Sequence, residues 1–190
     1  ALDLLIESEH GPDSSAYLVT NSRQVAQDAI AAIPGYWKEM SEQRVGFSST
    51  VLCGPRGGVI LAEDMEQAIA FVNDYAPEHL QVHASSPHDY LGMLRNAGEI
   101  LLGEHTPVCI GNFALGPNAV LPTNAAAMTR SPLGVHDYIK LVSIGYVTRK
   151  GYDLLAPYAN KFARYEGFDA HANAVSDMRT RAFEAGGDRS

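Results

Sequence analysis

Short apolar runs alternate along this chain with longer segments of helical period. The longer segments begin at residues typical of helix starts, such as Ser22, Asp64 and Pro87. This alternation predicts an α/β fold in which largely parallel strands form a layered sheet covered by helices. The expected strands are 16–20, 50–54, 58–62, 80–84 and 99–103, and the expected helices between them are 22–32, 64–75 and 87–96.

The two ends of the chain differ in sequence pattern from this alternating middle. The sequence begins directly on an amphipathic helical pattern, ALDLLIESEH, with no capping residue before it, as expected of a fragment. A long Gly-, Pro- and Asn-rich segment starts at Thr106, and structureless segments of this size are usually functional. Helices are expected after it at 135–142, 151–165 and 168–184. We therefore predict a main domain at 1–133 and a C-terminal helical extension at 134–190.

Composition narrows the classes of function. With 46% apolar and 19% charged residues, the 190 residues can bury one ordinary core. The net charge of −8 and the absence of a Lys/Arg run argue against nucleic-acid binding and favour a small-molecule ligand. No apolar run approaches the roughly 18 to 20 residues needed to span a membrane, and no signal peptide is found. We expect no membrane partner.

The chain has two cysteines, Cys53 and Cys109, each inside an apolar run. Both are expected to be buried. Neither a disulfide framework nor a CxxC metal site can be formed from them. Buried thiols of this kind fit a reducing, cytoplasmic location.

One Glu–His pair has a spacing that suits metal binding, and a second pair lies near the last predicted helix. His10 follows Glu7 by three residues on the first predicted helix, so that both side chains can converge on one point. The same spacing is common on exposed helix faces, which is the alternative interpretation. Glu166 precedes His171 near the start of the last predicted helix, where acidic residues also occur because they favour the helix dipole.

Glu78 and His79 form a third pair, placed after Pro77 and just before a predicted strand. Loops at strand ends often carry functional groups in α/β proteins. A carboxylate beside an imidazole supplies a base and an acid for two successive proton transfers. An exposed loop pair that serves only solubility is the alternative, and local pattern alone does not decide between them.

Four longer strings, read in order, resemble the motifs of one family, the histidinol dehydrogenases. They are NDYAPEHLQV (73–82), NAGEILLGEHTP (96–107), GNFALGPNAVLPT (111–123) and ARYEGFDAHANAV (163–175). The opening DLLIESEHGPDSSAYLVT (3–20) resembles the helix and strand that begin the second part of the family's catalytic domain. The resemblance covers nearly the whole chain.

The resemblance implies a zinc- and NAD-dependent alcohol dehydrogenase. It implies that 1–133 is the second part of a catalytic α/β domain with an incomplete Rossmann-like sheet, and that 134–190 is a helical tail for dimerisation. Glu78 would activate water and His79 would take the proton from the alcohol. The zinc ligands would be Glu7, His10, Asn112 and His171, and the residues contacting substrate would be His79, Asn112, Ala119 and Glu166. Glu166 and His171 would reach into the site of the partner subunit of a homodimer.

Three positions depart from the pattern of the family that the chain resembles. The family has Gln where this chain has Glu7 and Asp where it has Asn112, so that one carboxylate is gained and one is lost. Oxygen donors remain at both positions, which still suits zinc. The family has His where this chain has Ala119, and the loss of that polar contact argues against histidinol as the substrate.

The preferred hypothesis is therefore NAD-dependent, zinc-assisted oxidation of a small polar alcohol, such as an amino alcohol other than histidinol. No GxGxxG motif is present, and the residues that bind NAD stay unknown because the family's cofactor-binding half lies outside this sequence. The fragment alone is expected to be inactive. A non-catalytic metal-binding or dimerisation module is the alternative, and a zinc hydrolase with Glu78 as base is a third possibility, disfavoured by the absence of HExxH.

Overall fold

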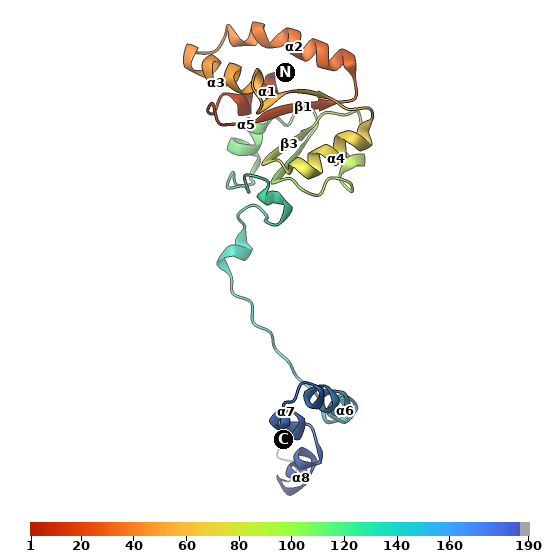
Figure 1. The fold of residues 1–190 in the computed structure, drawn as a ribbon. Coiled ribbons are helices and arrows are strands. Elements are labelled where there is room, and N and C mark those ends of the chain that lie inside the picture. Colours follow the sequence, from red (N-terminus) through yellow and green to blue (C-terminus); the bar gives the residue numbers. More distant parts are fainter. Residues whose placement is uncertain (187–190) are drawn as a thin grey trace. The chain divides into compact units, whose positions relative to one another are not determined.

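The computed structural model describes residues 1–186 and divides into two compact units, Ala1–Ile139 and Lys140–Ser190. Figure 1 shows the elements of both units along the chain. The first unit contains, in order, α1 (Leu2–Ser8), β1 (Ala16–Thr20), α2 (Arg23–Trp37), α3 (Glu42–Leu52), β2 (Gly57–Leu61), α4 (Met65–Tyr75), β3 (His79–Val82), the 3₁₀ turn η1 (Pro87–Tyr90), β4 (Glu99–Leu102), α5 (Val108–Ile110), the π-helical turn η2 (Gly111–Leu115) and the 3₁₀ turns η3 (Ala126–Met128) and η4 (Val135–Tyr138).

The strands pair in two separate parallel sheets, which confirms the α/β class. β1 lies beside β2, with Leu18 opposite Val59, and β3 lies beside β4, with His79 opposite Glu99. Parallel neighbours need a crossover connection, which α2 and α3 supply between β1 and β2. The single layered sheet that we expected is thus present as two pairs of strands within residues 1–186.

The core of the first unit lies where α1, α2 and α3 meet β1. Leu5, Ile33 and Val51 are buried there, and Trp37 packs against them. A buried hydroxyl of Ser8 on α1 lies 2.7 Å from that of Ser48 on α3, and the Trp37 indole donates to the Ser48 hydroxyl at 2.9 Å. Because buried polar groups are costly unless paired, these bonds fix the position of α1 on α3.

The second unit is helical, with α6 (Arg149–Tyr165), α7 (Asp169–Ala174) and α8 (Asp177–Gly186). The Thr148 hydroxyl caps α6 by accepting a hydrogen bond from the Gly151 amide. Ala163 and Ala172 are buried between α6 and α7. Several large apolar side chains of α6 are exposed within the described chain: Leu154, Leu155, Tyr158, Phe162 and Tyr165.

Some sequence predictions of secondary structure are wrong. Thr50 to Leu52 belong to α3 rather than to a strand, because a cap at Ser41 starts a helix that the apolar run completes. Residues 87–96 form only the turn η1, since the Asn73 side chain accepts from the Arg95 amide and donates to the Met93 carbonyl, which holds that segment as a loop. Residues 135–142 contain only η4, and 168–184 form two helices separated near Val175.

The expected burial of the cysteines is also wrong. Cys53 caps the C-terminal end of α3, and Cys109 lies in the single turn of α5; both are exposed. An apolar run that forms a helix presents only one side to the core. The position of each cysteine within an apolar run therefore did not imply burial. No helix within the described residues has both the length and the apolar character needed to cross a membrane.

Candidate active site

The end of α4 sets the position of the Glu78–His79 pair. Ala76 ends the helix in the left-handed conformation, at φ 51°, and the chain then turns through Pro77 into β3. The side chain of Asn73, together with its backbone carbonyl, which accepts from the Asn96 side chain, ties the last turn of α4 to the loop that precedes β4. His79 is the first residue of β3, and the position of its side chain is therefore set by the end of α4 and by the bonds from Asn73 to the loop before β4.

The start of β4 lies unusually close to this strand end. The Gly98 amide donates to the Pro77 carbonyl and the Glu99 amide donates to the Glu78 carbonyl, each at 2.9 Å. A Cβ at Gly98 would stand 2.6 Å from the Glu78 carbonyl oxygen, so only glycine permits this approach. The approach places Glu99 opposite His79, and His79 Nδ1 lies 3.0 Å from Glu99 Oε2.

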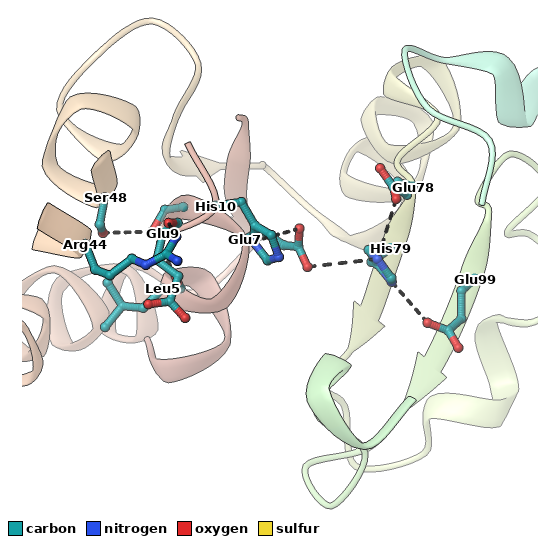
Figure 2. Close-up of polar contacts among 10 residues, drawn as sticks. Leu5, Glu7, Glu9, His10, Arg44, Ser48, Glu78, His79 and Glu99 are labelled. Atoms are coloured by element: carbon teal, nitrogen blue, oxygen red, sulfur yellow. Dashed lines mark hydrogen bonds and ion pairs between the residues drawn. The ribbon is translucent and has the colours of Figure 1, made fainter. Parts of the chain in front are cut away.

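The Nε2 side of the imidazole lies near two more carboxylates, as Figure 2 shows. His79 Nε2 lies 3.8 Å from Glu78 Oε1 and 4.0 Å from Glu7 Oε1. Glu7 comes from α1, and its second oxygen lies 3.9 Å from His10 Nδ1. The His79 side chain is only 8% exposed, so a nearly buried imidazole is surrounded by acidic groups from α1, from the turn before β3 and from β4.

The site changes the protonation of Glu78. Burial raises the pKa of this carboxyl above its ordinary value, and the Glu7 carboxylate raises it further; His79, and more weakly His10, act in the opposite direction. A raised pKa brings the group closer to the range in which it can exchange protons near neutral pH. The proton-handling role that the sequence suggested for Glu78 stays a prediction.

We expect the metal-free Glu78→Gln variant to resist denaturation better than the wild-type chain at pH 7. The folded chain binds the Glu78 proton more tightly than the unfolded chain does, so this contribution to stability is full below the unfolded pKa of about 4.5 and declines as pH rises through the raised folded pKa. Glutamine keeps the shape and removes the charge. Urea unfolding at pH 7 and below about pH 4 tests this. The small difference in stability between wild type and variant should be present at pH 7 and absent at the lower pH, and equal stability of the two proteins at pH 7 would contradict it.

Two buried oxygen atoms bear on the predicted zinc site. Glu7 Oε1 and Asn112 Oδ1 are both buried without a hydrogen-bond partner, as expected of atoms that a cation would satisfy. They belong to α1 and η2, and α1 packs against α5, which leads directly into η2. Residues 1–186 contain no group of three or more His, Cys, Asp and Glu side chains in a metal-binding arrangement. With an amide as one ligand, Glu7, His10 and Asn112 offer zinc a carboxylate, an imidazole and an amide oxygen.

A cavity of about 990 Å³ opens beside the histidine, within the first unit. It is lined by β1 and β3 along their lengths, and by Glu7, Glu78 and His79. Both polar atoms of the Gln81 side chain, on the same strand as His79, are buried without a partner. Because edges of β1 and β3 that are unpaired within residues 1–186 run along this cavity, only the end that carries Glu7, Glu78 and His79 bears on the candidate site.

The structure therefore brings together Glu7, His10, Glu78 and His79 from the predicted set. Ala119 lies in an exposed loop of the same unit, and Glu166 and His171 are exposed residues of the second unit, where His171 packs on Phe168. Their part in the site stays a prediction. Sequence reasoning missed Glu99, whose signal was the strand register: NAGEILLG and APEHLQV pair so that Glu99 faces His79.

Known proteins resemble this chain over most of its length. The sequence model of the histidinol dehydrogenase family matches residues 1–180. A histidinol dehydrogenase homolog of Colwellia psychrerythraea is 60% identical over 97% of this chain and 42% of its own length, and the histidinol dehydrogenase of Synechocystis sp. is 42% identical over 93% and 41%. The crystal structure of histidinol dehydrogenase from Elizabethkingia anophelis matches 95% of this chain and 41% of that protein, with a TM-score of 0.87 at 31% identity. The chain thus spans about two fifths of the relatives that it matches.

Proposed function

Because this chain belongs to the histidinol dehydrogenase family, we propose that it is the part of an NAD-dependent alcohol dehydrogenase that carries the proton-transfer groups and the zinc ligands. The observation that carries this proposal is the nearly buried His79, held between carboxylates beside a cavity. Since the chain covers only 41–42% of these relatives, turnover is proposed for the complete protein.

The proposed chemistry divides between His79 and Glu78. His79 Nε2 accepts the proton of the substrate alcohol, and Glu78 assists the entry of water when oxidation continues from the aldehyde to the acid. NAD, bound by residues outside this chain, would accept the hydride. Zinc, held by Glu7, His10, Asn112 and His171, would orient the alcohol and polarise its oxygen. Glu78 suits its role because its raised pKa lets it hold or release a proton closer to neutrality.

We also propose that the two parallel strand pairs belong to one Rossmann-like sheet in the complete protein. β1 and β3 each have one strand partner within residues 1–186, and both line the same cavity. A strand from the remainder of the protein would complete the sheet by pairing with the free edges.

The C-terminal segment is proposed to join two copies of the protein. α6 exposes Leu154, Tyr158 and Phe162, among others, and exposed apolar faces of this kind typically mark interfaces. In a homodimer, Glu166 and His171 would complete the site of the partner subunit, Glu166 by contacting substrate and His171 by binding zinc. This would explain why these residues lie in the second unit.

The substrate is proposed to be a small polar alcohol other than histidinol. Ala119 stands where the family has the imidazole that holds histidinol. The relatives named histidinol dehydrogenase homolog are 54–60% identical, against 31–42% for those named histidinol dehydrogenase. The greater identity to proteins named only as homologs of histidinol dehydrogenase supports a changed substrate.

We expect the complete zinc-loaded protein to reduce NAD with a small polar alcohol at a kcat/KM at least about tenfold higher than with histidinol, because one lost polar contact costs a kcal/mol or more of discrimination. NADH absorbance across a panel of amino alcohols and diols, with histidinol included, measures this. Histidinol as the best substrate of the panel would refute the argument from Ala119, and no NADH from any alcohol would refute the dehydrogenase itself.

A further inference from the structure

We propose that Glu99 is a positioning residue for His79, which keeps the imidazole proton on Nδ1 and so leaves Nε2 free to accept the proton of the substrate. The role given to Nε2 rests on the proposed function. The location of the imidazole proton does not, since it is a property of this chain alone. The two claims can therefore fail separately.

The geometry gives Glu99 the only close contact with an imidazole nitrogen among these carboxylates. Glu99 and His79 are directly opposed in the β3–β4 register, and their side chains meet at 3.0 Å. Glu7 and Glu78 lie on the Nε2 side at 4.0 and 3.8 Å, beyond hydrogen-bond distance. The two side chains of the close contact are 10% and 8% exposed, so little water competes with it.

The carboxylates compete for one proton. A neutral imidazole has a single N–H, and an ionised carboxylate can only accept a hydrogen bond. With Glu99 at hydrogen-bond distance, the N–H is best placed on Nδ1, and a hydrogen bond to an ionised acceptor is stronger than one between neutral groups. Without that acceptor, Glu7 and Glu78 would draw the proton to Nε2, where it would block the lone pair that must act as base.

The Glu99 carboxylate lies close to Gly111, the first residue of η2. A Cβ on Gly111 would lie 3.1 and 3.2 Å from the two carboxylate oxygens and 3.1 Å from Leu101 Cδ2. The backbone of η2 therefore lies directly against the carboxylate. The same turn carries Asn112, so one short segment both lies against Glu99 and supplies a proposed zinc ligand.

The test is the Glu99→Gln variant, which keeps the shape of the side chain but removes its charge and can also donate to Nδ1. NMR of the metal-free chain with ¹⁵N-labelled imidazoles reports which ring nitrogen of His79 carries the proton, and the signal is assigned by its loss in His79→Asn. We expect Nδ1–H in the wild type and Nε2–H in the variant. In the complete protein, kcat should fall at least about tenfold while KM changes little.

Glu104→Gln is the matched control, because Glu104 also lies near a histidine, at 3.7 Å from His105, but is 80% exposed. It should change neither the spectrum nor kcat. An unchanged proton position in Glu99→Gln, or an unchanged kcat when His79→Asn is inactive, would overturn the inference. A third outcome separates the two claims: the proton moves to Nε2 in Glu99→Gln, but both Glu99→Gln and His79→Asn turn over normally. This would support the effect of Glu99 on the proton position and refute the role proposed for His79.

Discussion

Replacement of His79 by Asn in the complete protein is expected to lower kcat by about 10²- to 10⁴-fold, the usual contribution of a positioned general base. Asparagine is close in size and polar but cannot take a proton at neutral pH. The loss should fall on kcat more than on KM, because the proton is transferred in the reacting complex rather than on binding. Steady-state NADH production measures both constants.

His105→Asn provides the control for this variant. His105 is 93% exposed and also has a Glu neighbour, so it matches His79 in residue type but not in burial or in place. Its replacement should leave kcat and thermal stability unchanged. A His79→Asn enzyme that folds normally and retains more than about a tenth of wild-type kcat would show that another group takes the proton.

Replacement of His10 or of His171 by Ala should lower zinc content and turnover together. Loss of an imidazole ligand is expected to cost at least the roughly 10-fold in metal affinity that is lost with even an outer partner of a ligand. Metal analysis of the purified complete protein, beside its kcat, measures both effects, and His105→Ala is the control. Unchanged zinc stoichiometry in both variants would refute the ligand assignment.

The His171→Ala variant also tests whether the tail acts on the partner subunit. If His171 completes the partner's site, a mixed dimer of His79→Asn and His171→Ala subunits contains one site with both residues intact. Mixing the two inactive variants after reversible dissociation should then restore part of the activity. Failure to regain activity in mixed dimers confirmed by mass would place His171 in the site of its own subunit.

The elements that the sequence predicted well are those with strong local signals. The strand at 16–20 agrees with β1, and the Asp64 cap starts α4 one residue later at Met65. The strand predicted at 50–54 is wrong because its short apolar run, Val51 to Cys53, fits a strand and a packed helix equally well. The Pro87 start signal also failed, since side-chain bonds from Asn73, distant in sequence, override local helix propensity in residues 93–96.

The site was partly visible in the same way. Adjacent Glu78 and His79, and the spacing of Glu7 and His10, are local patterns, and the fold brings all four together. Glu99 was not predicted because its place in the site depends on which strand lies beside β3 and in what register, and no local pattern in the sequence shows either. The division of the strands into two pairs, β1 with β2 and β3 with β4, could not be predicted for the same reason.

The mass of the reduced cofactor is the most direct test of the central claim, that the His79 site serves hydride transfer from an alcohol to NAD. The complete zinc-loaded protein would be given NAD and its best alcohol from the panel, deuterated at the carbinol carbon. We expect reduced NAD that is heavier by one deuterium, formed by the wild type and formed at least about 10²-fold more slowly by His79→Asn. Reduced NAD without deuterium, or undiminished formation by His79→Asn, would contradict it.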